Sequence, residues 1–520
     1  MERSRKLRLG LAVLLAAGIF GYRYYQDNVA TGAADTADAA RPGTDAGTAT
    51  VEPPAPPRMF GDIAFEPCTL SSPFGIDGIE AQCGTYSVAE NPAEPGGRQV
   101  ELALAWIPAD QEAEAAPDPV FLLAGGPGQA ARAVYPAAAS AFKDVLDNRH
   151  VILLDQRGTG GSNLLACDFD EDVEPTGDAA VRATEQCRDE LSKKADLRFY
   201  TTTDAVRDLE AVRQALGVDQ LNLVGVSYGT RVAQQYAMRH PEHTRTIVLD
   251  SVAPNELILG NDFAANLEQA LDLQFALCAK SDTCTQQVGD PRAQLDALMA
   301  KLRTDPPLVR YRDPSTGEMR EELLEPEMVA GLFRMYAYMP MAAALLPLQI
   351  HEAAAGRYDN LAALAHMLSE NIEGQMAMGM QLSVICAEDA HGLRDDPAAE
   401  GTLLGNQLTG FLAKQCEVWP KGDMPGDFHQ PLSTDVPALV LEGELDPVTP
   451  PRYGEQVVET LPNGRLLVLR GQGHNVFGVG CMPELMGQFI ATADAKSLDA
   501  KCLDDLAYTP PFTTFNGWEP

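Results

Sequence analysis

A serine flanked by two glycines stands where an apolar run gives way to an amphipathic one, in Gly225-Val226-Ser227-Tyr228-Gly229. A G-x-S-x-G pentapeptide between a strand and a helix is typical of a sharp turn that lifts a serine hydroxyl clear of a sheet. The glycines are needed because side chains there would collide with the neighbouring strand and helix. Ser227 is therefore the candidate nucleophile, and the alternative is a glycine-flanked helix cap.

A serine hydroxyl becomes a good nucleophile when a base takes its proton, and that base is usually a histidine oriented by a carboxylate. Of the eight histidines, His474 alone follows a strong late strand-like run, in "LLVLRGQGHNV". Asp446 comes just after an earlier run, in "ALVLEGELDPVTP". Serine, acid and histidine in this order, each after a strand, predict a catalytic triad. Glu444 is a competing acid, and the turn "LDPVTP" favours Asp446.

Acyl transfer at Ser227 would also need hydrogen-bond donors for the oxyanion of a tetrahedral intermediate. The backbone N–H of Tyr228, the residue after the nucleophile, is one predicted donor. We assign the second to Gly126, in the loop "AGGPGQ" that follows an earlier apolar run, and the alternative for this loop is an ordinary Pro-Gly turn. No cysteine or histidine spacing of the zinc-binding kind is present, so we expect neither a metal nor a cofactor.

Short apolar runs alternate with helical patterns over residues 59–254, which predicts a parallel sheet with helices on both faces. Residues 255–430 are mostly helical in pattern, and strand-like runs return within 431–520. The simplest account is one α/β domain, formed by 59–254 and 431–520, that is interrupted by a helical insertion. The insertion is too long to be a loop.

The first 30 residues combine a basic start with an uncharged apolar stretch at 9–22. This stretch fits the apolar part of a signal peptide and is short for a membrane span, which needs about 20 residues. Because no clean cleavage site follows, both a cleaved signal peptide and an uncleaved signal anchor stay open. Residues 31–58 are rich in Ala, Pro and Thr with one large aliphatic side chain, which predicts a disordered linker.

The chain carries a formal net charge of −35, which disfavours nucleic acid as a partner. Its ten cysteines are an even number, and export would permit disulfides. We favour pairing between neighbours along the chain, with buried free thiols as the alternative. The favoured pairs are Cys68–Cys83, Cys167–Cys187, Cys278–Cys284, Cys386–Cys416 and Cys481–Cys502.

Four motifs, "GGPG", "DQRGTGGS", "GVSYGT" and "GELDPVTP…GQGH", together resemble the proline iminopeptidase and tripeptidyl aminopeptidase family of α/β-hydrolase serine peptidases. The resemblance covers about residues 59–520. The sequence departs from this resemblance at Ala124, where proline iminopeptidases usually have histidine. The serine–tyrosine pair of the turn, Ser227-Tyr228, and the long insertion are more similar to the tripeptidyl aminopeptidases. The resemblance implies an α/β-hydrolase fold, with a mostly parallel sheet, helices on both faces and a large helical cap before the last strands.

The resemblance also implies an exported serine aminopeptidase that cuts short peptides near their free N-terminus through an acyl-enzyme. We expect a periplasmic or extracellular location, with a possible N-terminal membrane tether. Such an enzyme needs an acidic group in the cap to pair with the substrate ammonium. The matching stretch, "QLSVICAEDAHG", offers Glu388 and Asp389, of which we favour Glu388. The alternative is an exposed acid at a helix end.

Several interpretations stay open at this point. A carboxylesterase would use the same triad, and an α/β-hydrolase scaffold can also be kept as a non-catalytic binding module. Arg157 is interpreted as a structural ion-pair partner, with a substrate carboxylate clamp as the alternative. The methionines of "MYAYMPM" and "GQMAMGM" belong either to the core of the cap or to an adaptable apolar pocket.

Overall fold

The computed structural model describes residues 56–71, 78–167, 177–372 and 376–518. The predicted signal segment and residues 31–55 of the predicted linker lie outside this part of the chain. Strand β1 (Arg58–Phe60) begins inside the segment 31–58, so the predicted start of the folded core is one residue too late. In the ranges given above, no helix is long and apolar enough to cross a bilayer.

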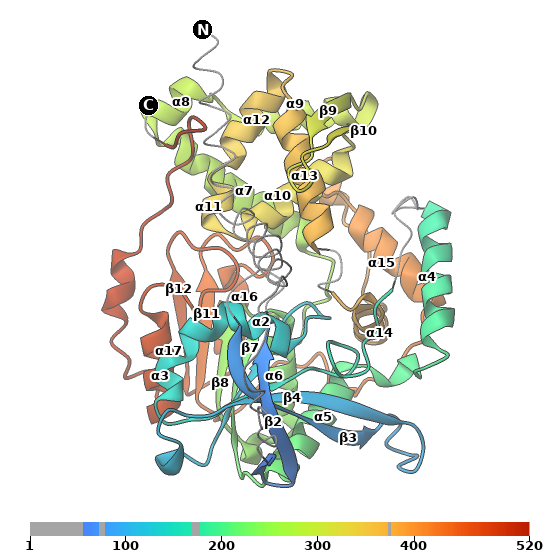
Figure 1. Ribbon diagram of the computed structural model, residues 1–520. Coiled ribbons are helices and arrows are strands. Elements are labelled where there is room, and N and C mark those ends of the chain that lie inside the picture. Colours follow the sequence, from blue (N-terminus) through green and yellow to red (C-terminus); the bar gives the residue numbers. More distant parts are fainter. Residues whose placement is uncertain (1–55, 72–77, 168–176, 373–375, 519–520) are drawn as a thin grey trace, which may run out of the picture.

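A ten-stranded sheet forms the centre of the molecule (Figure 1), in the order β1-β2-β3-β4-β6-β5-β7-β8-β11-β12. Strands β1 to β4 and the β4–β6 pair are antiparallel, whereas the neighbours from β6 to β12 run parallel. The central strands are continuous apolar runs because both of their faces are covered. The strands after β1 are β2 (Ile63–Leu70), β3 (Ile79–Ala89), β4 (Gln99–Ile107), β5 (Val120–Leu123), β6 (Val151–Leu154), β7 (Leu221–Val226), β8 (Thr244–Asp250), β11 (Ala438–Gly443) and β12 (Gly464–Leu469).

Helices pack on both faces of this sheet, as predicted. One face is covered by α5 (Thr202–Leu216), α6 (Tyr228–Arg239) and α16 (Pro451–Val458), whose apolar side chains join one buried cluster. The other face is covered by α2 (Ala131–Ala138), α3 (Lys143–Leu146) and α17 (Met482–Thr492), which join a second cluster. The fold is therefore the predicted α/β arrangement, with an antiparallel extension at one edge.

The cap, residues 255–430, connects β8 to β11 and divides into two parts. The upper cap contains an apolar core of its own and a two-stranded sheet, which the prediction of a mostly helical insertion did not specify. In Figure 1 it lies above the strand ends. Its elements are α7 (Phe263–Ala279), α8 (Asp282–Gln287), α9 (Pro291–Thr304), β9 (Leu308–Arg312), β10 (Met319–Leu323), α10 (Pro326–Ala337), α11 (Pro340–Ala343), α12 (Leu346–Ala354) and α13 (Asp359–Ile372).

The lower cap consists of α14 (Met378–Glu388) and α15 (Gln407–Val418). Its buried side chains belong to the same apolar cluster as α5 and α6 of the core. Helix α4 (Gly177–Leu191), which precedes β7 in the chain, lies beside α15 (Figure 1), and Gln415 Nε2 donates to Thr184 Oγ1 at 3.0 Å. The lower cap is thus built into the core domain.

All five predicted disulfides are present, and each joins two cysteines that are neighbours along the chain. The alternative of buried free thiols is wrong. Cys386–Cys416 joins the two helices of the lower cap, and Cys278–Cys284 lies within the upper cap.

Candidate active site

Ser227 lies in the turn between β7 and α6, with φ 54° and ψ −121°, a conformation that non-glycine residues rarely adopt. A Cβ atom at Gly225 would lie 2.5 Å from the carbonyl oxygen of Gly229, and one at Gly229 would lie 2.1 Å from that of Leu123. Side chains at these two positions are therefore excluded, as the sequence argument requires. The Ser227 N–H donates to the carbonyl of Asp250 at 2.9 Å, which fixes the turn to the end of β8.

Asp446 and His474 follow β11 and β12, and the structure brings them together. His474 Nδ1 lies 2.7 Å from Asp446 Oδ2, and both residues are buried. The N–H groups of Val448 and Thr449 donate to Asp446 Oδ1 at 2.8 and 2.9 Å, and Thr449 Oγ1 donates to Oδ2 at 3.0 Å. Because this carboxylate accepts from Nδ1–H, the lone pair of the neutral imidazole is on Nε2, as a general base requires.

The competing acid Glu444 is engaged elsewhere. Its carboxylate accepts from the Gly471 N–H at 2.8 Å and from Tyr508 Oη at 2.9 Å. The carboxylate that accepts from His474 Nδ1–H is that of Asp446, the acid that the sequence favoured.

The loop after β5 lies against the nucleophile. A Cβ atom at Gly125 would be 3.1 Å from Ser227 Cβ, and one at Gly126 would be 3.0 Å from Met376 Cε. Tyr228 is the first residue of α6, and first-turn N–H groups have no acceptor within their own helix. The two predicted oxyanion donors, Gly126 and Tyr228, are therefore on segments that adjoin Ser227, and their donor role stays a prediction.

The cap reaches His474 through Tyr338, at the end of α10. The His474 N–H donates to the Tyr338 carbonyl at 2.9 Å, and the two rings are 4.9 Å apart in an edge-to-face arrangement. A Cβ atom at Gly473 would lie 2.2 Å from that carbonyl oxygen, so the contact requires glycine there. Sequence reasoning missed Tyr338, and Gly473 of the "GQGH" motif is the one local signal of this close approach.

The two methionine runs serve different roles. Met380 is fully buried in the core cluster, whereas Met339 and Met341, which follow Tyr338, are 57% and 55% exposed. The core interpretation therefore holds for Met380 and not for Met339 and Met341, and the pocket interpretation stays a prediction. Met376 is the methionine beside Gly126.

Glu388, the predicted amino-group anchor, lies at the end of α14 and is 1% exposed. Its two oxygens accept from Thr202, from the N–H at 2.7 Å and from Oγ1 at 2.9 Å, and Thr202 Oγ1 lies 2.7 Å from Tyr228 Oη. Arg231 Nη1 is 3.8 Å from Glu388 and 2.9 Å from Asp389, both of which are buried. Glu388 is thus no exposed helix-end acid, and its pairing with a substrate amine stays a prediction.

Burial raises the pKa of Glu388 to about 8, against the opposing attraction of Arg231 and the hydrogen bonds from Thr202. Burial likewise raises the pKa of Asp389, and Arg231 opposes that shift. The shorter ion pair shows that the guanidinium charge is directed mainly to Asp389. Glu388 is therefore linked to Tyr228 through its hydrogen bonds with Thr202.

Arg157 has the predicted structural role. It is 1% exposed and makes two 2.6 Å hydrogen bonds to the Asp208 carboxylate. It also donates to the carbonyls of Phe199 at 2.8 Å and Glu90 at 3.1 Å. Through these bonds the guanidinium joins loops that follow the strands. The interpretation of Arg157 as a structural ion-pair partner is therefore confirmed.

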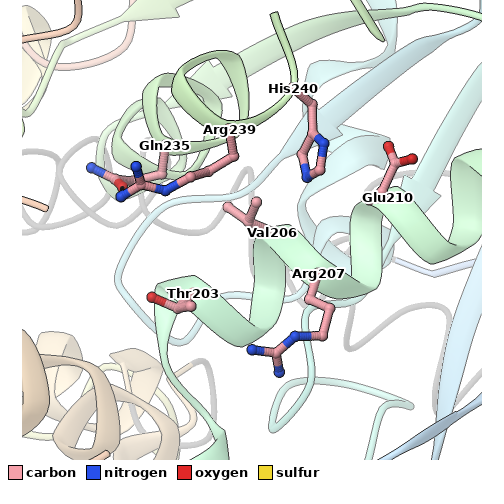
Figure 2. Close-up of a pocket in the computed structure, with 7 residues that line it drawn as sticks. All are labelled: Thr203, Val206, Arg207, Glu210, Gln235, Arg239 and His240. Carbon is pink, nitrogen blue, oxygen red and sulfur yellow. Dashed lines mark hydrogen bonds between the residues drawn. The ribbon is translucent and has the colours of Figure 1, made fainter. Parts of the chain in front are cut away.

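A cavity of about 370 Å³ lies between α5 and α6 (Figure 2), lined at one end by Glu210 and His240. It is lined by Arg239 and His240 at the end of α6, whereas Ser227 precedes the first residue of that helix. Ligand atoms of Glu210, His240 and His243 lie within 4.8 Å of one another. However, both Glu210 oxygens already accept from Arg213, at 2.9 and 2.7 Å, so a guanidinium supplies the positive charge that a metal ion would bring.

A family model for the alpha/beta hydrolase fold matches residues 118–480. The chain belongs to this family. Serine protease Hip1 of Mycobacterium tuberculosis is 25% identical over 492 residues, which cover 86% of this chain and 92% of that relative. Tripeptidyl aminopeptidase of Streptomyces coelicolor is 24% identical over 470 residues, with coverage of 81% and 83%. The resemblance to α/β-hydrolase serine peptidases is confirmed.

A third relative carries a different name. Carboxylesterase B of Mycobacterium tuberculosis is 33% identical over 268 residues, which cover 46% of this chain and 51% of that relative. The family therefore includes proteins named for ester as well as peptide hydrolysis.

Proposed function

We propose that the protein is an exported serine aminopeptidase that hydrolyses peptide bonds near the free N-terminus of short peptides. The observation that carries the proposal is the 2.7 Å His474–Asp446 hydrogen bond in a site whose serine occupies a strained elbow. Similarity along most of the chain to a serine protease and a tripeptidyl aminopeptidase supports peptides as the substrate class.

The proposed reaction is that of a Ser–His–Asp triad. Ser227 Oγ attacks the scissile carbonyl while His474 Nε2 takes its proton, and the imidazolium then delivers this proton to the leaving amine. Asp446 holds the ring and stabilises its positive charge. The N–H groups of Gly126 and Tyr228 stabilise the oxyanion. Water, activated by the same histidine, then hydrolyses the acyl-enzyme and frees the N-terminal fragment.

The surroundings of the site support short substrates and an oxidising compartment. Tyr338 and Met376 bring the cap against the His474 loop and the Gly126 loop, so a folded protein chain would have poor access. Five disulfides support a location outside the cytoplasm, because reducing conditions would not maintain them.

The direct test compares fluorogenic Pro-, Ala- and Ala-Ala-Phe-amides, each with a free or an acetylated N-terminus. We expect turnover of the free substrates alone, with loss of activity in Ser227→Ala, and the best substrate then indicates how many residues are released. Equal turnover of acetylated substrates would contradict an aminopeptidase.

The proposed anchor has its own test in Glu388→Gln. If Glu388 pairs with the substrate ammonium, the variant loses roughly 10-fold in kcat/KM on free-amine substrates, about 1.4 kcal/mol, and little on N-blocked esters. An equal loss on both would show that Glu388 acts through Thr202 and Tyr228 instead. Thr202→Val, which removes one of those hydrogen bonds and keeps the carboxyl, is the matched control.

A carboxylesterase is the second candidate, because Carboxylesterase B is 33% identical to this chain over 268 residues. It predicts turnover of simple esters and none of peptide amides, with the same dependence on Ser227. A purified protein that is inert on both classes would instead favour a non-catalytic scaffold.

A further inference from the structure

Four consecutive backbone amides, from His474 to Phe477, are bound by groups outside their own loop. The His474 N–H donates to the Tyr338 carbonyl, and the Asn475 N–H donates to Ser251 Oγ at 2.8 Å. The N–H groups of Val476 and Phe477 both donate to the Asp250 carboxylate. The Val476 N–H lies 3.0 and 2.9 Å from its two oxygens, and the Phe477 N–H lies 3.0 Å from Oδ2.

This arrangement is an anion-binding turn built around a carboxylate of the protein itself. Asn475 has φ 70°, and the turn it makes points the next two N–H groups to the same side, as in the backbone nests that bind anions. Asp250 is fully buried at the end of β8. Its carboxylate accepts from these two amides and, at 3.3 Å, from Ser251 Oγ, and the shape of the loop depends on the carboxylate.

The same residue also holds the nucleophile. The Asp250 carbonyl accepts from the Ser227 N–H, and its side chain holds the residues that follow His474. One buried aspartate thus connects the two turns whose side chains must exchange a proton, although it contacts neither reacting side chain.

We propose that Asp250 is a positioning residue that sets the place of the His474 imidazole relative to Ser227. The proposal rests on the proposed Ser–His–Asp chemistry but not on the substrate being a peptide. Asparagine at this position offers one acceptor oxygen, and its NH₂ group would face a backbone N–H. The loop would therefore shift, and shifts of about 1 Å can cost about 100-fold in rate.

Glu442 supplies a matched control. It is a second fully buried carboxyl in the same region, on β11, and it accepts from the Val252 N–H at 3.1 Å. None of its hydrogen bonds goes to the His474 loop in the part of the chain that the structure describes. Glu442→Gln and Asp250→Asn therefore make the same chemical change at similar burial, but Asp250→Asn alone disturbs the loop.

The first measurement is the rate at which a fluorophosphonate probe labels Ser227. The second is kcat and KM for hydrolysis of a p-nitrophenyl ester. Neither readout depends on the natural substrate. The imidazole Nδ1–H resonance of His474 is followed by proton NMR. We expect Asp250→Asn to lower kcat and the labelling rate by about 100-fold, with KM nearly unchanged and the resonance shifted or lost. Glu442→Gln keeps all of these within about 3-fold of the wild type.

Ser251→Ala protects the test against a folding failure. It removes the hydroxyl that accepts from the Asn475 N–H and donates to Asp250 Oδ1 at 3.3 Å, but it leaves the bonds from Val476 and Phe477 to Asp250 in place. We expect an intermediate loss of kcat with an unchanged melting temperature. The proposal is overturned if Asp250→Asn folds and keeps wild-type kcat, or if Glu442→Gln loses as much activity. It is also overturned if Ser251→Ala retains full kcat while Asp250→Asn fails to fold, since Asp250 would then have a structural role only. Failure of the peptide assay above would leave these outcomes unaffected.

Discussion

The two parts of the cap differ in how they join the domain beneath them. The lower cap, α14 and α15, has no apolar core of its own in the described residues and shares the cluster of α5 and α6. It is fixed by the buried Arg231–Asp389 ion pair and by the bonds from Thr202 to Glu388. The upper cap packs around its own core. An insertion that is one stretch in sequence is therefore two structures with different consequences for the site.

The upper cap touches the catalytic loops mainly through polar contacts. Tyr338 accepts from His474, and Asn266 Nδ2 donates at 2.6 Å to the carbonyl of Val448, whose own N–H binds Asp446. Tyr453 Oη also donates to Asp262 at 2.7 Å. We infer that the lower cap chiefly supports folding and that the upper cap chiefly affects the placement of the acid and the histidine.

The largest difference in stability is expected at the buried ion pair of the lower cap. Arg231→Met leaves Asp389 buried without its cation, which costs about 3–5 kcal/mol in the free energy of unfolding. The matched variant is Arg334→Met in the upper cap, whose guanidinium lies 4.5 Å from the Phe263 ring and contributes about 0.5–1 kcal/mol. Urea unfolding of both variants checks this, and equal losses would remove the distinction between the two parts.

Two buried leucines sharpen the comparison further. Leu382 in the lower cap and Leu346 in the upper cap are both fully buried, and each change to alanine costs about 2–5 kcal/mol locally. We expect Leu382→Ala to lower the melting temperature of the whole core. We expect Leu346→Ala to unfold the upper cap at a lower temperature than the core. Between these two thermal transitions, Ser227 should still react with a fluorophosphonate. A single shifted transition in both variants would show that the cap and core unfold as one unit.

A smaller change than the loss of the ion pair or of a buried leucine is expected from Gly473→Ala, which acts on activity more than on stability. The new methyl group would meet the Tyr338 carbonyl and push the upper cap away from the His474 loop. We expect kcat to fall by about 10-fold, equivalent to about 1.4 kcal/mol in the activation free energy. Gly478→Ala is the control, because its Cβ would be 4.0 Å from the nearest atom, Ala141 Cβ. Equal kcat in the two variants would contradict a role for the Tyr338 contact.

The sequence predicted those features that depend on neighbours along the chain. The elbow at Ser227, the acid and histidine after successive strands, and the five disulfides all follow from local patterns. The hairpin of β9 and β10 was missed because its strands are short, and most of β10 is charged and exposed. The Asp250 and Tyr338 contacts join residues more than 130 positions apart, so no local pattern could indicate them.

The environment of Glu388 was beyond sequence reasoning for the same reason. The partner of its carboxyl group, Thr202, precedes it by 186 residues, and the packing that buries both depends on α14 joining the core. The acid was predicted as the anchor for a substrate amino group in the cap, with an exposed helix-end acid as the alternative, and it lies buried at the end of α14. The burial of Glu388 depends on packing between segments that are distant in sequence, so the local pattern did not indicate it.

Covalent trapping of the acyl-enzyme tests the account most directly. The protein is mixed with an Ala-Ala-Phe-amide substrate, quenched in acid and digested, and the modified residue is identified by mass spectrometry. The account predicts that the N-terminal fragment of the free-amine substrate is attached to Ser227, and that the acetylated substrate leaves much less adduct. Turnover without an adduct on Ser227, or equal adduct from the acetylated substrate, would contradict a serine aminopeptidase.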